Sequence, residues 1–371
     1  MAYVGFGDLK DVGILPLWDL SSIKKLELAD GTTFDQVVLE ASAVAFEASA
    51  EITRLPIFRT LFSIQNGVTL KYGTYTGGGI QEATEYSVPD PYRGKTTGHS
   101  LPIKLFERSV GWTRMMLEKV AMDQIEADLT VMVNDIQDHS QVKMLTRLFA
   151  TGAETVGDTA GASVPFADGG TADATWIPKR GPWGEVFANT HNHYLRHATL
   201  DVATSIQLAF DHLWEHGHRP PFTLIGSSAD AATYQALTEW RRPSWDQWII
   251  YRDASAATDK AKLNADDLNT WDGLLELPKG IVQVHLSPRV PTAYYNMHKA
   301  YGVGDARNPL RMRIDPKRGF GWQNVPGIYV NDPTTLAAFI NEFGWGIGED
   351  RTNTVNVEID SAGNYASPTI S

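Results

Sequence analysis

The sequence predicts an α+β fold, in which helices and strands are grouped rather than strictly alternating. One long helical pattern covers residues 112–149 without glycine or proline. A polar segment rich in glycine and proline, residues 66–111, comes directly before it. The last third of the chain is dominated by short alternating runs typical of strands. The regular strand–helix repeat of a doubly wound parallel sheet is absent from this order.

Composition and charge exclude several classes of protein. The chain has 371 residues, of which 43% are hydrophobic and 20% charged, as in ordinary globular proteins. No run approaches the ~18 apolar residues of a membrane span, so no membrane partner is expected. The N-terminus lacks the features of a signal peptide. The absence of cysteine excludes disulfides, thiol nucleophiles and thiolate metal sites.

The net charge of −12 argues against nucleic-acid binding through a basic surface. Such a chain could still surround nucleic acid without adhering to it. Eleven tryptophans are a high number for this length, and large aromatic residues are enriched in protein interfaces. The composition therefore favours extensive contacts between protein subunits.

The first 65 residues predict an arm followed by a helix. Residues 1–31 show no sustained periodicity, and scattered apolar residues, among them Val4, Phe6 and Trp18, suit an extended arm that docks on another surface. Thr33 and Gln36 have the spacing of a capping box, and helix-forming residues continue from there to Pro56.

Residues 66–111 predict a long β-hairpin. The runs "VTLKYGTYTGGG" and "LPIKLFE" alternate as strands do, and the tip between them is punctuated by glycine and proline. A two-stranded hairpin by itself is marginally stable in water. The hairpin therefore needs a partner surface.

Residues 112–149 predict an amphipathic helix, about 57 Å long if unbroken. The alternative is two helices with a break near residues 138–140. Residues 151–175 read as a loop. Residues 198–218 predict a helix that ends at Gly217, and Ser227 with Asp230 predicts the start of another helix over residues 229–240.

The strands expected after residue 220 are "PFTLIG", "IVQVHLSP", "TAYYNMH", "LRMRIDP" and "TNTVNVEID". In the last of these, Val355, Val357 and Ile359 share one face, and Asn356 and Glu358 share the other.

Six of the ten histidines lie within 28 residues, and three interpretations compete for them. His212 and His216 are four residues apart on a predicted helix, and imidazole is a common ligand of transition metals. With His285, the cluster suggests a metal-dependent hydrolase. However, the repeated units of a barrel and the HExxH spacing are absent. Structural or surface histidines are favoured, and no metal or cofactor is predicted. The six are His191, His193, His197, His212, His216 and His218.

Residues 241–253 interleave arginine with tryptophan and tyrosine. This pattern suits stacking on single-stranded bases or packing against other subunits, and the acidic chain favours the second. The runs "YGVGDARNP" and "FGWGIGEDR" lie among strand-like segments, so turns or bulges are their expected use. No paired carboxylates or nucleophile motifs stand out, and an enzyme is not expected.

The order of these parts and the closing phrase "AAFINEFGWGIGEDRTNTVNVEI" resemble the major capsid proteins of tailed bacteriophages, whose Hong Kong 97-type fold is shared with encapsulin shells. The resemblance covers residues 33–360. It implies an N-terminal arm and helix at 1–65, an extended loop at 66–111 that lies over a neighbouring subunit, a peripheral domain with its spine helix at 112–197, an axial domain at 198–325 and closing strands at 326–371.

The resemblance also implies contact residues, partners and a location. Pentamers and hexamers of the chain would form a shell around DNA without sequence-specific binding. The location would be the virion, after assembly in the host cytoplasm, with separate scaffolding, portal and decoration proteins as further partners. Relatives carry an upstream scaffolding region that is not seen here. The implied contacts are Val4, Phe6 and Trp18 in the arm; Tyr86, Pro89, Tyr92, Arg93 and Lys95 in the loop; Arg241, Arg242, Trp245, Trp248 and Arg252 in the axial domain; and Phe343, Gly344, Gly346 and Arg351 in the closing motif.

Some relatives link subunits by a Lys–Asn isopeptide bond. Lys71 and Lys95 lie in the hairpin, and Asn353 and Asn356 lie near the C-terminus, but spacing does not pair them, and no cross-link is expected. The leading hypothesis is a capsid protein that encloses a double-stranded DNA genome. The alternatives are an encapsulin-type compartment and a metal-dependent hydrolase that uses the His191–His218 cluster.

Overall fold

The computed structural model describes most of the chain in two compact units. The described residues are 28–33, 36–37, 39–46, 60–73, 96–111, 116, 119–155, 162–170, 192–241, 249–251, 260–262, 272–325, 335–361 and 363–370. Unit 1 comprises residues 1–54, 104–141 and 314–343, and unit 2 comprises residues 55–103, 142–313 and 344–371. Each unit therefore draws on segments that lie far apart in the sequence.

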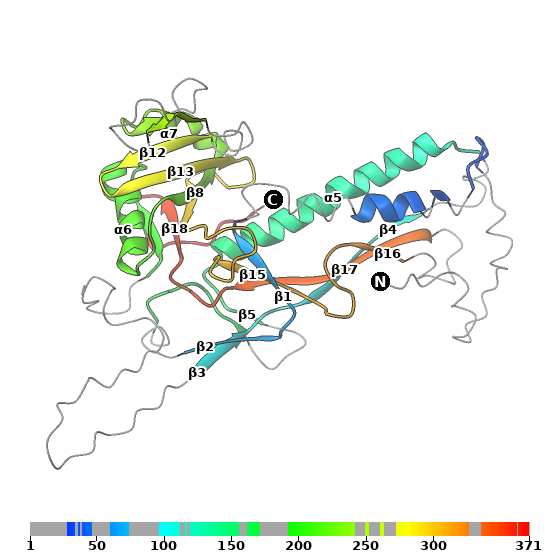
Figure 1. Cartoon of the computed structure of the whole chain (residues 1–371), viewed down its shortest axis with the longest axis horizontal. Coiled ribbons are helices and arrows are strands. Elements are labelled where there is room, and N and C mark those ends of the chain that lie inside the picture. Colours follow the sequence, from blue (N-terminus) through cyan, green and yellow to red (C-terminus); the bar gives the residue numbers. More distant parts are fainter. Residues whose placement is uncertain are drawn as a thin grey trace, which may run out of the picture. The chain divides into compact units, whose positions relative to one another are not determined.

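A seven-stranded mixed sheet is the centre of unit 2 (Figure 1). The pairs β13–β8 and β18–β7 are parallel, and the other neighbours are antiparallel. The predicted strands after residue 220 are confirmed here, apart from "LRMRIDP", which joins another sheet. In spatial order the strands are β7 (Tyr194–His197), β18 (Thr354–Ile359), β14 (Tyr294–His298), β8 (Phe222–Ser227), β13 (Gly280–Ser287), β12 (Gly273–Leu277) and β9 (Trp240–Arg241).

Two helices pack on one face of this sheet. The face carries α6 (Gln207–Glu215) and α7 (Ala231–Gln235), whose apolar side chains meet those of the strands in one core. Val355 and Val357 of β18 are fully buried in this core, and Ile359 packs against it, as their alternation predicted. The fully buried members include Ile206, Ala209, Phe210, Leu213, Phe222, Leu224, Leu275, Val282, Val284, Tyr295 and Met297.

Local signals determine where these helices begin and end. Asp201 caps the turn η3 (Val202–Ile206) by accepting the Thr204 N–H, and Gly217 ends the helical segment with φ of 88°. The predicted end at Gly217 is therefore confirmed. The Ser227 side chain caps η4 (Ser228–Asp230), but α7 ends at Gln235 instead of continuing to residue 240. The last residues of that segment instead enter β9, which pairs with β12.

The opposite face of β14 and β18 is polar yet buried. The Asn296 amide donates to Asn356 Oδ1 at 2.8 Å, and the Asn356 amide donates to the Leu148 carbonyl at 2.9 Å. The His298 Nδ1–H donates to Asn296 Oδ1 at 2.9 Å. These hydrogen bonds offset part of the cost of burying polar groups.

Further strand pairs lie outside the seven-stranded sheet, and the first of them belongs to a five-stranded sheet in the order β1-β15-β17 (Thr335–Ile347)-β16 (Gln323–Val325), with β4 (Lys104–Gly111) paired to β17. β1 (Phe62–Gln65) runs parallel to β15 (Leu310–Ile314), which confirms the "LRMRIDP" strand. A two-stranded ribbon joins β2 (Thr69–Gly73) to β3 (Thr96–Ser100). Two further pairs are β5 (Glu154–Thr155) with β6 (Ala162–Ser163), and β10 (Ile249–Tyr251) with β11 (Lys260–Lys262).

The predicted hairpin needs one correction. Its first arm is β2, but its second arm is β3, residues 96–100, rather than "LPIKLFE". That run instead leads into β4 (Lys104–Gly111) in unit 1, where it pairs antiparallel with β17 (Thr335–Ile347). The alternation of "LPIKLFE" correctly predicts a strand, but an alternating pattern does not show with which other strand it pairs.

The long helix α5 (Met122–Phe149) begins in unit 1 and ends in unit 2 (Figure 1). Its 28 residues correspond to about 42 Å. The helix passes through residues 138–140 without a break, so the two-helix alternative is wrong. α5 itself begins at Met122, and residues 112–115 and 117–118 of the predicted helix lie outside the described residues. Asp30 caps the helix there, because its Oδ2 accepts the Met122 N–H at 2.8 Å.

The rest of unit 1 packs against α5 and β17. β16 (Gln323–Val325) pairs with β17, and Phe106 of β4 lies 4.8 Å from Phe343 and 4.6 Å from His139 between ring centroids. The predicted capping box is present, since Gln36 Oε1 accepts the Thr33 N–H at 2.8 Å. In the described residues, no helix combines the length and apolar character needed to cross a membrane.

Candidate functional site

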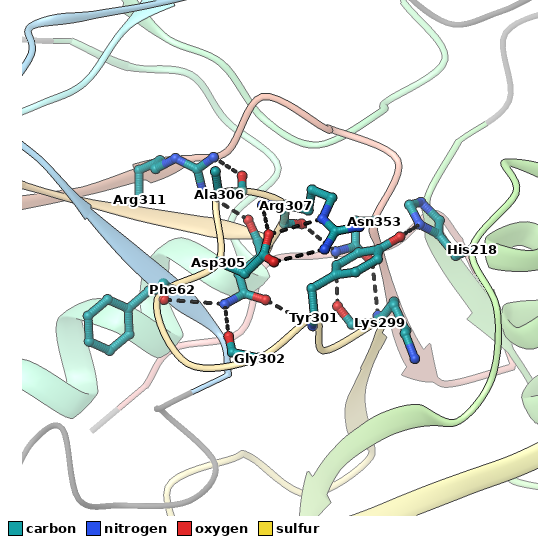
Figure 2. Close-up of polar contacts among 11 residues, drawn as sticks. Phe62, His218, Lys299, Tyr301, Gly302, Asp305, Ala306, Arg307, Arg311 and Asn353 are labelled. Carbon is teal, nitrogen blue, oxygen red and sulfur yellow. Dashed lines mark hydrogen bonds and ion pairs between the residues drawn. The ribbon is translucent and has the colours of Figure 1, made fainter.

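A loop in unit 2, residues 299–308, is held by a network of hydrogen bonds, and we refer to it as the turn loop (Figure 2). Gly302 and Gly304 adopt φ of 126° and 69°, which L side chains rarely tolerate. The Tyr301 N–H donates to Asn308 Oδ1 at 3.1 Å, and the Asn308 amide donates to the Gly302 carbonyl at 2.7 Å. One asparagine therefore closes both sides of the turn.

A charged pair braces the turn loop. Arg307 donates from Nε and Nη2 to the Asp305 carboxylate at 3.0 and 2.8 Å, and its guanidinium lies 4.2 Å from the Tyr301 ring centroid (Figure 2). These hydrogen bonds lower the pKa of Asp305 to about 2. The planar guanidinium thus bridges a carboxylate and an aromatic face, a geometry that lysine could not reproduce.

The closing segment, residues 350–354, holds the turn loop on the sheet. The Asn353 amide donates to the carbonyls of Lys299 and Arg307 at 3.0 and 2.8 Å, and its Oδ1 accepts the Lys299 N–H at 2.9 Å. His218 contacts the Tyr301 hydroxyl at 2.8 Å through Nδ1. These four hydrogen bonds, three with Asn353 and one with His218, all lie within unit 2 and hold the base of the loop in place.

The predicted closing motif lies at close contacts of the backbone. A Cβ on Gly344 would lie 2.1 Å from the Pro102 carbonyl oxygen, and one on Gly346 would lie 2.3 Å from Leu101 Cδ2. The backbone atom at Gly344 leaves room for glycine alone, whereas a side chain at Gly346 would require Leu101 to shift. Phe343 is fully buried in unit 1. The motif is therefore structural in the described residues.

Arg351 of the closing motif is buried and bonded to the backbone. Its Nε donates to the Pro165 carbonyl at 2.7 Å, and its Nη2 donates to the Phe166 carbonyl at 3.2 Å. Arg147 makes the same kind of contact to Gly152 and Val164. Burial lowers the pKa of Arg147. These two guanidinium groups hold residues 152 and 164–166 against the end of α5 and the closing segment.

The histidine cluster does not form a metal site within the described residues. His193 is buried; its Nδ1–H donates to the Thr354 carbonyl at 2.7 Å, and its Nε2 lies 3.1 Å from His216 Nε2. The His212 ring centroid is 5.7 Å from that of His193. In the part of the chain that is described, no three histidine, aspartate or glutamate side chains converge as metal ligands. His191 lies outside the described residues.

His285 and His197 are likewise not part of a metal site in the described residues. Burial alone lowers the pKa of His285 to about 4, and burial is the first cause of the lowered pKa of His197. Both imidazoles are therefore neutral near pH 7. The hydrolase that the cluster suggested receives no support from this geometry.

Most of the contact residues that the resemblance implied lie outside the described residues. Arg241 is the described member of the axial group, and its Nε contacts the Glu276 carboxylate at 3.1 Å between β9 and β12. The Asn353 and Asn356 side chains are buried and hydrogen-bonded, whereas Lys71 is exposed. Those outside are Val4, Phe6, Trp18, Tyr86, Pro89, Tyr92, Arg93, Lys95, Arg242, Trp245, Trp248 and Arg252.

Sequence reasoning identified "YGVGDARNP" as a turn but not as a candidate site. The available signals were the two glycines around Val303 and the Asp305–Arg307 spacing. Asn353, 45 residues further on, gave no signal that it would close the loop, because that contact exists only in the folded sheet.

Comparisons with known proteins identify the fold. No family model and no curated protein matches this chain. A solved structure from Mycobacterium phage Patience has 18% identity over 92% of this chain and 93% of its own, with a TM-score of 0.61. The capsid of the native GTA particle (11% identity, 84% and 91%, TM-score 0.45) and that of Ralstonia phage GP4 (12%, 99% and 99%, 0.45) are more distant.

The assignment rests on the first structure, because the other two superpose too weakly. A shared fold over nine tenths of both chains agrees with the α+β architecture described above. The chain therefore has the fold of a bacteriophage structure, which confirms the Hong Kong 97-type α+β fold that the sequence resembles.

Proposed function

We propose that this chain is the major capsid protein of a tailed phage or prophage. Copies of the chain form pentamers and hexamers in an icosahedral shell that encloses double-stranded DNA, and no enzymatic step is involved. The observation that carries the proposal is the fold shared with the Mycobacterium phage Patience structure across nearly the whole of both chains. Fold alone does not fix function, so two further observations are needed.

The first is apolar surface that the subunit leaves exposed. In unit 1, Leu39 and Phe46 are 64% and 76% exposed and are separated by seven residues, hence lie on one face of their helix. Leu105 of β4 and Val131 of α5 are 53% and 60% exposed. Several large apolar side chains on the surface of one small unit are typical of an interaction surface.

The second observation concerns the ribbon β2–β3. In the described residues it is a sheet of only two strands, and two strands are marginally stable without further packing. Leu70 and His99, which face each other in register, are buried at its base. A two-stranded ribbon whose base is anchored in its own subunit is suited to packing the rest of its surface against a neighbouring copy.

Charge supports the proposed content of the shell. With a net charge of −12, most of the chain repels DNA, so packed DNA would stay mobile within the shell. The location that follows is the virion capsid, with assembly in the host cytoplasm. Scaffolding, portal and decoration proteins would be separate partners.

The direct test is assembly of the purified protein. We expect particles of uniform size in negative-stain electron microscopy and a large species in size-exclusion chromatography with light scattering. Nuclease-protected DNA in particles from infected or induced cells would separate a capsid from a compartment that holds an enzyme. A compact monomer or small oligomer under all assembly conditions would contradict the proposal.

A second test isolates the extended loop. Gly73 and Thr96 are paired at the ends of β2 and β3, so a two-residue Asn-Gly turn can replace residues 74–95 without separating the strands. We expect this variant to keep the thermal transition of the wild-type subunit but to form no closed shells. Normal shells would show that the segment is dispensable, and an unfolded variant would place it in the core.

A further inference from the structure

The turn loop exposes an apolar residue at its tip. Val303 is 64% exposed between Gly302 and Gly304. Turns favour asparagine, aspartate, serine and glycine, and β-branched side chains are poorly suited to them. A Cβ added at either flanking glycine would meet no atom within 4 Å, so the tip stands clear of the described chain. Val303 therefore contributes little to the stability of its own subunit.

The loop beneath this tip is rigid. Asn308, Asn353 and the Asp305–Arg307 pair hold it through hydrogen bonds of 2.7–3.1 Å. A rigid loop loses little conformational entropy when it binds, which makes preorganised loops efficient contact surfaces. The isolated subunit gains no stability from presenting an exposed valine on a firmly hydrogen-bonded loop, which points to a contact outside the subunit.

A lysine lies at the base of the same loop. Lys299 Nζ donates to the Pro221 carbonyl at 3.1 Å and lies 6.0 Å from the Tyr301 ring centroid. Among the described residues, no carboxylate lies within ion-pair distance of this ammonium. Partial burial and the nearby Arg307 lower the pKa of Lys299. By contrast, the carboxylate of Asp305 is already engaged by Arg307. The loop thus lacks an anion for Lys299.

We propose that the turn loop is a contact surface for a second copy of this chain, in which Val303 packs on an apolar surface of the neighbour and Lys299 meets one of its carboxylates. The charge of the chain favours another copy as the binding partner. Each copy carries 44 acidic and 32 basic residues, so it is rich in carboxylates that could pair with Lys299. Exposed apolar side chains in unit 1 supply the matching kind of surface. The inference rests on the proposed shell.

The test uses a substitution that separates folding from assembly. Val303→Asn places a favoured turn residue at the tip, so the thermal transition of the unassembled subunit should stay the same or rise. Loss of the apolar contact should raise the critical concentration for assembly by roughly tenfold, the effect of removing a well-packed contact residue. Lys299→Met keeps the side-chain length but removes the charge, and should raise the critical concentration several-fold.

The matched control is Lys317→Met, an exposed lysine of unit 1 that lies outside the turn loop, and it should assemble like wild type. If wild type and Val303→Asn assemble at the same concentration, the inference fails while the proposed shell stands. If wild type forms no large assembly, the proposed function itself fails. If Lys299→Met weakens binding to a single- or double-stranded oligonucleotide but leaves assembly unchanged, the partner is nucleic acid and the inference is overturned.

Discussion

At the scale of single residues, unit 2 buries many polar and charged side chains, and several of them are hydrogen-bonded to backbone carbonyl groups. Arg351 and Asn353 both donate to carbonyl groups of sequence-distant segments. Removing one partner of such a bond leaves the other group buried without compensation, which costs more than the bond contributes. The closing segment is therefore more sensitive to substitution than its polar sequence indicates.

A close backbone contact of the closing motif gives a stability prediction. Gly344→Ala would place a Cβ 2.1 Å from the Pro102 carbonyl oxygen, a backbone atom that cannot move away alone. We expect a loss of at least 2 kcal/mol in the free energy of unfolding, comparable to overpacking in a core, measured by urea denaturation. Gly152→Ala is the control, because its Cβ would meet nothing within 4 Å. Equal effects of the two substitutions would contradict the crowding argument.

Buried histidines predict an acid-sensitive unit 2. Burial lowers the pKa of His99 and His285 to about 4 and that of His298 to about 3. The unfolded chain takes up these protons near pH 6.5, before the folded chain does, so stability is full above that pH and falls as the pH drops toward 4. A shift of this size in one histidine corresponds to roughly 3 kcal/mol.

The variant His285→Gln tests this argument. In the wild-type protein, burial is the sole cause of the lowered pKa of His285, and no hydrogen bond contributes to it. We expect the free energy of unfolding to fall less between pH 7 and pH 4.5 in the variant than in wild type, when both are measured in urea. Parallel pH profiles would show that His285 is protonated equally in the folded and unfolded states.

At the scale of elements, caps from distant residues decide where helices start. The amphipathic pattern of residues 112–149 continues without interruption, yet α5 begins at Met122 because Asp30 accepts its N–H. The hydrogen bond from the Met122 backbone is the first cause of the lowered pKa of Asp30. A helix boundary is thus fixed by a contact across 92 residues of sequence.

Removal of this cap should loosen the first turn of α5. Asp30→Ala leaves the Met122 N–H without its acceptor, and we expect amide hydrogen exchange of the first turn to accelerate several-fold while the last turn keeps its protection. Asp30→Asn should retain most of the protection, because asparagine caps helices as well as aspartate does. Unchanged exchange in Asp30→Ala would show that the boundary is fixed by other contacts.

At the scale of the whole molecule, we expect the proposed shell to be held without covalent links through Asn353 and Asn356. Asn353 and Asn356 are fully buried, and their amide groups donate to Lys299, Arg307 and Leu148 carbonyls. An isopeptide bond at either residue would require these hydrogen bonds to break and the side chain to leave the sheet. Noncovalent contacts then have to supply the stability of the shell.

This expectation can be checked on assembled particles. Boiling in detergent should return a single monomer band, and mass spectrometry of digested particles should contain no peptide in which Lys71 is joined to Asn353 or Asn356. A ladder of higher bands that contains either linked peptide would contradict the buried geometry. Deamidating agents offer a further control, since the exposed asparagines should react before these two.

Much of the fold was predictable from the sequence because its signals are local. The alternation of Val355 and Val357, the glycine at position 217 and the Thr33–Gln36 capping box each depend on neighbours within a few residues, and all are present in the structure. The candidate site was less predictable. Lys299, Asn308 and Asn353 are ordinary polar residues in the sequence, and only their contacts give them a role.

The sequence by itself determined the segments that form helices and strands, the turns that glycine requires and the acidic balance of the surface. Tertiary structure alone decided that "LPIKLFE" leads to β4 and its partner β17, that α5 begins at Met122 and that Asn353 closes the turn loop. The physical reason is range. Periodicity and capping act within a turn or a strand, whereas strand partners, distant caps and buried hydrogen bonds exist only after segments hundreds of residues apart have packed together.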